Sequence, residues 1–134
     1  MPPVELPRGE GAGVVAAGAA LAGLAVAAGA FGAHALQDTL TAAALQTYET
    51  AARYHMYHAI ALLVVGRLLS RRATSLLRAT FWLFLAGILL FSGSLYALAL
   101  TGEKALGYLT PIGGAAFLAG WACLALAKLR PARP

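Results

Sequence analysis

The stretch Gly13–Ala33, GVVAAGAALAGLAVAAGAFGA, decides the fold class of this chain. It contains no charged residue, and its length matches the roughly 20 apolar residues that a transmembrane helix requires. Residues 33–35 resemble a signal-peptidase site, but a signal-peptide core is only about 7 to 15 residues long and follows a basic leader. The leader here carries two glutamates beside one arginine. We therefore expect a retained membrane span.

The composition extends this prediction to the whole chain. Of its 134 residues, 60% are hydrophobic and 11% are charged, and the mean hydropathy is +0.75. Soluble domains are about 25% charged, so an all-α polytopic membrane protein is expected. We predict one domain, residues 1–134, built as a four-transmembrane-helix bundle. Thr110 should cap the last helix, with Pro111 at its first position. The expected spans are residues 13–33, 54–69, 79–100 and 111–128.

Basic residues are distributed unequally about these spans. Cytoplasmic loops of membrane proteins carry an excess of lysine and arginine. The sequence therefore predicts that both termini and the connection at residues 70–77 are cytoplasmic. Eight basic residues fall on this side and two on the other. The eight are Arg8, Arg67, Arg71, Arg72, Arg78, Lys128, Arg130 and Arg133; the two are Arg53 and Lys104.

The segment before the second span allows two structures. Residues 34–64 contain neither proline nor glycine, so one long helix could begin near Thr39. From Thr39 to Leu69 it would measure about 46 Å at 1.5 Å per residue, more than a hydrocarbon core of about 30 Å. Residues 39–53 could instead form an amphipathic helix at the interface, followed by a bend. The sequence alone leaves both open.

Polar side chains gather toward the outer ends of the expected helices. Thr47, Thr50, Tyr54 and His58 fall in one stripe about 80° wide on a helix, with His55 beside it. If Arg53 and His55 extend to lipid headgroups, they need no function. Ionisable groups at membrane depth often mark functional sites. The candidate ligand-binding residues are His34, Thr50, Arg53, Tyr54, His58, Ser92, Ser94, Tyr96 and Thr110.

These residues allow several chemical interpretations. His34 and His58 could close hydrogen bonds between helices, bind a ligand or ion, or ligate a metal or haem. Ser92 and Ser94 could line the same outer cavity or bond to carbonyls of their own helix. The sequence has no nucleotide-binding glycine loop, no HExxH pattern and no nucleophile motif, so we assign no catalytic residue, metal site or cofactor. Whether the chain is an enzyme stays open, with a non-enzymatic role favoured.

Four ordered motifs resemble a known family. They are Phe31-Gly32-Ala33-His34-Ala35-Leu36, the Thr50 to Ala59 stretch, Phe91-Ser92-Gly93-Ser94-Leu95-Tyr96, and Thr110-Pro111-Ile112-Gly113-Gly114 with Gly120-Trp121. Together they resemble the YgdD-like family of small bacterial inner-membrane proteins of uncharacterised function, which has small eukaryotic transmembrane relatives. The resemblance covers about Gly13 to Trp121. It implies a four-helix protein of the inner membrane and no particular activity.

Three functional hypotheses follow. The first is a protein that binds a lipid, a small molecule or a partner helix at the outer polar cluster. The alternatives are a transporter or channel component acting as an oligomer, and a haem- or metal-binding membrane enzyme. Small-xxx-small patterns such as Gly18 with Ala22 predict tight packing within the chain or a homo-oligomer. The net charge of +5 is explained by topology, so the lipid bilayer and not nucleic acid is the expected partner.

Overall fold

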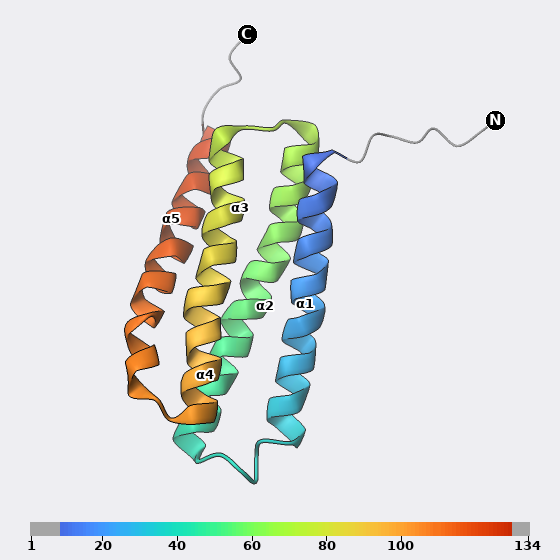
Figure 1. Cartoon of the computed structure of the whole chain (residues 1–134). Coiled ribbons are helices and arrows are strands. Elements are labelled where there is room, and N and C mark those ends of the chain that lie inside the picture. Colours follow the sequence, from blue (N-terminus) through green and yellow to red (C-terminus); the bar gives the residue numbers. More distant parts are fainter. Residues whose placement is uncertain (1–8, 130–134) are drawn as a thin grey trace, which may run out of the picture.

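The computed structural model describes residues 9–129, and this part of the chain is helical without any strand. Arg8, Arg130 and Arg133 of the orientation prediction lie outside the described residues. In Figure 1, α1 begins and α5 ends at the end of the molecule where α2 connects to α3. The elements are α1 (Glu10–His34), α2 (Ala42–Arg71), α3 (Ser75–Gly87), η1 (Ile88–Ser92), α4 (Gly93–Thr101), η2 (Lys104–Tyr108) and α5 (Thr110–Leu129).

Three helical segments are long and apolar enough to cross a membrane. They are Glu10–His34, Ser75–Thr101 and Lys104–Leu129. The second of these is one rod made of α3, the π-helical turn η1 and α4. The all-helical membrane architecture expected from the sequence is thus confirmed at this level. The second predicted span, residues 54–69, lies within α2, which is not one of the three segments.

Helix α2 is unbroken over 30 residues, about 45 Å. Thr41 caps its start, since the side-chain oxygen accepts a hydrogen bond of 3.2 Å from the amide of Ala44. Of the two structures that the sequence allowed before the second span, the molecule has the continuous helix. No separate helix precedes the second span, because every residue of 42–71 belongs to one helix, which begins at Ala42 and not near Thr39.

Helices α1 and α2 pack closely because small residues line the seam between them. The buried small residues of α1 recur every seven positions, at Gly11, Gly18, Ala25 and Gly32. A methyl group placed on Gly18 would lie 3.0 Å from the Ala59 carbonyl oxygen of α2. One placed on Gly32 would lie 2.8 Å from the Tyr48 ring. Lipid does not press apolar helices together, so this close backbone approach is what holds the pair.

The π-helical turn η1 forms a second close contact, with α5. Gly113 of α5 lies directly on the backbone of Leu90 and Phe91, and a methyl group there would sit 2.8 Å from the Leu90 carbonyl carbon. A π-helical turn is wider than an α-helical one and interrupts the hydrogen-bond ladder. The glycine lets α5 approach the widened turn without steric conflict.

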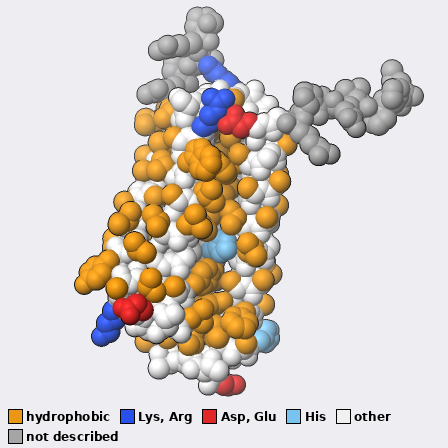
Figure 2. Space-filling view, viewed as in Figure 1, with side chains coloured by type: hydrophobic (Ala, Val, Ile, Leu, Met, Phe, Trp, Pro, Cys, Tyr) orange, Lys and Arg blue, Asp and Glu red, His pale blue; other side chains and the backbone are white. Residues whose placement is uncertain are grey.

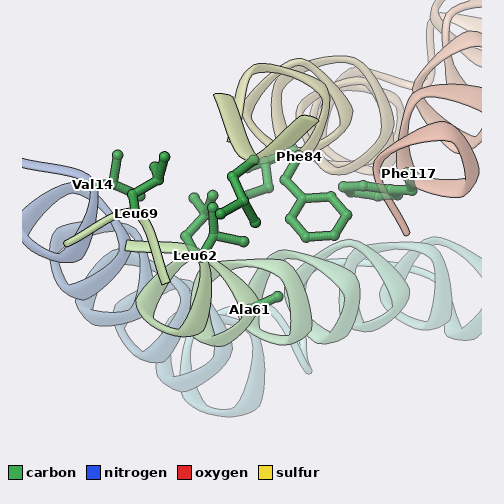
Figure 3. Packing of buried hydrophobic residues seen from close by; sticks show 9 residues of the cluster. Val14, Ala61, Leu62, Leu69, Phe84 and Phe117 are labelled. Atoms are coloured by element: carbon green, nitrogen blue, oxygen red, sulfur yellow. The ribbon is translucent and has the colours of Figure 1, made fainter. Parts of the chain in front are cut away.

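The helix backbones pack mainly as a row. The closest neighbours are α1 with α2, α2 with the α3–η1–α4 rod, and the rod with α5, and side chains of α5 also contact His58 of α2. Figure 1 shows α1 and α5 on opposite edges of this row. Figure 3 shows the larger apolar core, in which Val14 of α1 lies near Leu69 of α2, and Phe84 of the rod faces Phe117 of α5.

Charged side chains are confined to the two ends of the molecule on the face shown in Figure 2, and apolar side chains cover the length between them. At the end where α1 begins, the Arg78 Nε atom lies 2.9 Å from a carboxylate oxygen of Glu10. Both side chains are about half exposed, so solvent screens the pair and it contributes little to stability. The pair shows that the first turn of α1 lies beside Arg78, near the start of α3.

Candidate functional site

The buried face of α2 differs from the stripe predicted by sequence. Tyr48, His55 and His58 are buried at helical spacing with Leu62 below them, whereas Tyr54 is 39% exposed. The interpretation in which His55 extends to lipid headgroups does not hold, because its side chain is 7% exposed and lies on the buried face. The apolar positions at spacing of three and four place His55 at the centre of the buried face.

His58 is fully engaged within the protein. Its Nδ1 donates to the Tyr54 carbonyl oxygen at 2.8 Å, and its Nε2 accepts from Trp121 Nε1 at 3.1 Å. The ring stacks on Phe117, with centroids 3.4 Å apart and planes at 9°. Since a backbone carbonyl can only accept, Nδ1 carries the hydrogen and the imidazole is neutral. His58 is therefore a packed, hydrogen-bonded core residue with no free ring nitrogen.

His55 is only partly engaged. Its Nδ1 lies 3.2 Å from the hydroxyl of Tyr96 on α4, while its Nε2 is buried without a hydrogen-bond partner. The side chain is only 7% exposed. The ring faces the carbonyl of Leu21 on α1, but Nε2 does not reach hydrogen-bond geometry with it. His55 thus leaves one ring nitrogen available inside the molecule.

The Tyr96 hydroxyl decides which nitrogen of His55 carries the hydrogen. His55 Nδ1 is the one hydrogen-bond partner of this hydroxyl among the described residues. If Tyr96 donates to Nδ1, one polar group is left unmet, the Nε2–H. If Nδ1 donates to Tyr96, two are left unmet, the tyrosine hydrogen and the Nε2 lone pair. Each unmet buried group costs about 1–3 kcal/mol, so the first arrangement is favoured.

Ser92 presents a second unpartnered atom. Its side chain is completely buried, and its Oγ makes no hydrogen bond. Ser92 ends the π-helical turn and lies one helical turn before Tyr96, on the same face of the rod. Ser94 differs, since its Oγ bonds to the Phe91 carbonyl at 3.0 Å and to the Thr110 hydroxyl at 2.7 Å. The predicted back-bonding therefore holds for Ser94 and not for Ser92.

We call His55, Ser92 and Tyr96 the polar layer. Two apolar clusters lie on either side of it. One contains Leu62 and Ile88, and the other contains Tyr48 and Ala99. Figure 2 shows one histidine side chain at mid-height among apolar side chains. The polar layer interrupts the apolar core between the two clusters.

The other predicted site residues do not join this layer. His34 is exposed at the end of α1, about 20 Å along that helix from Leu21. Arg53 is exposed, and the Thr50 hydroxyl bonds to the Gln46 carbonyl of its own helix. His34 and His58 therefore do not lie at one level, and neither the hydrogen bond nor the shared metal or haem that would join them is formed. His58 lies about 20 Å from the α2 end at Arg71, near the middle of the helical length.

Sequence reasoning missed His55, Tyr48 and Trp121 as members of the buried network. The signal was present in α2, where Tyr48, His55 and Leu62 are seven residues apart and share the heptad seam with buried alanines. For Trp121 no local signal exists, because its bond to His58 joins positions 63 residues apart. Among residues 9–129, no group of three histidine, cysteine or acidic side chains lies close enough to hold a metal ion.

Comparisons with known proteins agree with the resemblance at the level of the family. The model of the family "Protein of unknown function (DUF423)" matches residues 28–114. A UPF0382 membrane protein of Staphylococcus epidermidis is 47% identical over 113 residues, 84% of this chain and 92% of the relative. YwdK of Bacillus subtilis, a UPF0382 membrane protein, is 44% identical over 84% of this chain and 93% of its own length.

A third relative comes from Haemophilus influenzae, a UPF0382 membrane protein 46% identical over 78% of this chain and 84% of its own length. No solved structure matches the chain. The expectation of a membrane protein family of unknown function is confirmed, while the YgdD-like name and the eukaryotic relatives stay predictions. The chain belongs to the DUF423 family, whose function is unknown, and shares it with the UPF0382 membrane proteins.

Proposed function

We propose that this chain is a four-span membrane protein whose polar layer binds an uncharged small molecule or lipid from the bilayer. The observation that carries the proposal is the pair of buried, unpartnered atoms, His55 Nε2 and Ser92 Oγ. Buried polar groups in folded proteins are nearly always hydrogen-bonded, and an exception calls for an explanation. A bound ligand that pairs with these atoms offsets their cost of about 1–3 kcal/mol each.

The surroundings favour an uncharged ligand. The two apolar clusters beside the polar layer present Leu62, Ile88, Tyr48 and Ala99 and no ionised side chain. Burying an unpaired charge among such groups is far more costly than burying a neutral polar group. The structure also engages both nitrogens of His58 and leaves His34 exposed, which removes the support for a haem held between them.

Packing supports α2 as a membrane span in addition to the three apolar segments. Gly66 and Ser70, near one end of α2, lie against Gly11 of α1, and Tyr48, near the other end, lies against Gly32. Because α1 and α2 are antiparallel and in contact over this whole length, a bilayer crossed by α1 is also crossed by α2. The outer turns of α2, about residues 42–48, then project beyond the membrane.

The charges support cytoplasmic termini in the inner (plasma) membrane. Arg67, Arg71, Arg72, Arg78 and Lys128 lie toward the end where α1 begins, and the opposite half carries Arg53 and Lys104. The positive-inside rule places the first end in the cytoplasm. An alkaline phosphatase fusion after Lys104 should therefore be active, and one after Arg72 inactive. The reverse pattern of activity would overturn this orientation.

The ligand proposal is tested by native mass spectrometry of protein extracted in mild detergent. We expect the wild type to retain a bound species, and His55→Phe with Ser92→Ala to lose it. His34→Ala is the matched control, because this histidine is exposed at the end of α1 and should leave binding unchanged. The proposal fails if no species is retained, or if the folded double variant retains it as well as the wild type.

The expected homo-oligomer stays a separate prediction. Gly23 and Gly29 on α1 have open space where a side chain would be, so neither position is packed against another described residue. Small residues on a membrane helix permit close packing with another helix. A second copy of the chain could pack at either position, and neither belongs to the polar layer.

A further inference from the structure

We propose that the ligand of the polar layer is a membrane-soluble molecule with a carbonyl group, and that His55 donates to this carbonyl through Nε2. This inference rests on the proposed function and names the chemistry of its ligand. It follows from the direction of the hydrogen bonds around His55, taken together with its burial and its place under the edge between α1 and α4.

The first step concerns the donor. Tyr96 donates to Nδ1 in the favoured arrangement, so Nε2 carries the hydrogen and requires an acceptor. The Leu21 carbonyl of α1 lies beside the ring and keeps a second lone pair in addition to its helix bond, but Nε2 does not reach hydrogen-bond geometry with it. Nε2 remains without a partner beside it. An incoming group must therefore be a hydrogen-bond acceptor.

The second step concerns which acceptor fits. Carboxylates and phosphates accept strongly, but none has a cation within the polar layer to balance its charge. An ester or ring carbonyl accepts without charge and is carried by molecules that dissolve in the bilayer. Ser92 Oγ, one helical turn from Tyr96, can donate to a second oxygen of the same molecule. Acyl esters of lipids and quinones share this chemistry.

The third step concerns access. Helix α1 packs along α2 and is not a packed neighbour of α4, so the edge between them is covered by side chains alone. His55 lies under this edge, beside Tyr96 of α4 and Leu21 of α1, and its side chain is 7% exposed. In this proposal a ligand dissolved in the bilayer reaches His55 laterally by parting these covering side chains, without crossing the charged ends of the molecule.

Tyr96 acts as a positioning residue in this arrangement. Its hydroxyl sets the tautomer of His55, and its ring is held by edge contact with Tyr48 at a centroid distance of 5.0 Å. Tyr48 is itself fixed by a hydrogen bond of 3.0 Å from its hydroxyl to the Ala28 carbonyl of α1. Tyr96→Phe removes the tautomer control but keeps the ring, so the hydrogen should no longer reside only on Nε2.

Nitrogen-15 NMR of histidine-labelled protein tests the proposal directly. The protein is placed in nanodiscs of diether phosphatidylcholine, which has no ester carbonyl, of diester phosphatidylcholine, or of diether lipid with added decyl-benzoquinone. His34→Ala assigns the exposed histidine. We expect Nε2–H at His55 and Nδ1–H at His58 in every sample. The His55 ring proton should shift downfield when a carbonyl source is present, and Tyr96→Phe should abolish that shift.

The two carbonyl samples distinguish the sources. A shift in diester lipid alone indicates a lipid ester, a shift with the quinone alone indicates a quinone, and a shift in both supports the carbonyl chemistry without selectivity. Identical His55 signals in all three samples overturn the inference, since Nε2 is then served by Leu21 or water. A species retained in mass spectrometry without any carbonyl shift leaves the proposed function standing and removes only this ligand class.

Discussion

Gly113→Ala should destabilise the folded protein by about 3 kcal/mol, the upper end of the cost of overpacking a core. The added methyl group would collide with the Phe91 backbone nitrogen and lie 2.8 Å from the Leu90 carbonyl carbon. Backbone atoms inside a helix cannot move aside as a flexible side chain can. Relief requires α5 to withdraw from η1, which also weakens the Ser94–Thr110 hydrogen bond and the stacking of Phe117 on His58.

The next residue supplies a matched control for this experiment. Gly114→Ala would place its methyl group 3.8 Å from the Phe91 ring, an ordinary van der Waals contact. Unfolding in sodium dodecyl sulfate, followed by circular dichroism, should show a lower midpoint for Gly113→Ala and little change for Gly114→Ala. Equal midpoints for the two variants would show that the close contact between α5 and the π-helical turn does not matter for stability.

The helical fold was predictable because apolar length is a local property. The stretch Gly13–Ala33 predicts a membrane span by itself, whatever the rest of the chain contains. The long α2 was predicted as one of two alternatives, since the absence of proline and glycine permits a helix but does not show whether it bends. The π-helical turn at Ile88–Ser92 was not predictable, because it depends on how Gly113 of α5 meets the backbone.

The candidate site was predicted less well than the fold. His58 was identified, but the exposed Tyr54 was placed on its face and the buried His55 beside it. Which side of α2 is buried depends on the neighbours α1 and the rod, and both sides of this helix carry polar residues. Polarity alone therefore could not identify the buried face. The heptad alignment of Tyr48, His55 and Leu62 with the small residues of α1 does identify it.

Several residues of the family motifs contribute to packing between helices, and this packing accounts for them without a ligand. Gly113 allows α5 to pack directly on η1. A methyl group added to Gly120 would lie 2.6 Å from the Phe84 ring, and Gly32 packs against Tyr48. Ser94 and Thr110 bond to each other. Ser92 and Tyr96 of the same motifs differ from these residues. The Ser92 hydroxyl has no hydrogen-bond partner, and the Tyr96 hydroxyl bonds to His55, whose Nε2 has none. This contrast is what directs the functional proposal to the polar layer.

Trp121→Phe should cost about 1–3 kcal/mol, because it leaves the buried Nε2 of His58 without a donor. The Trp121 ring also packs 4.9 Å from Phe84, and phenylalanine retains part of this contact. Trp82→Phe is the matched control, since Trp82 is 63% exposed and makes no hydrogen bond to another described residue. Its free energy of unfolding should stay within about 0.5 kcal/mol of the wild type.

A double-mutant cycle separates the hydrogen bond from the packing. His58→Phe removes the acceptor, keeps a flat ring against Phe117, and leaves the Trp121 N–H without its partner. When both partners are replaced, no polar atom of the pair remains without a hydrogen bond. The loss of stability in the double variant should therefore be about 1–2 kcal/mol smaller than the sum of the losses in the two single variants. Strict additivity in sodium dodecyl sulfate unfolding would mean that the indole–imidazole bond contributes nothing. His58 would then be held by its stacking on Phe117 and its bond to Tyr54 alone.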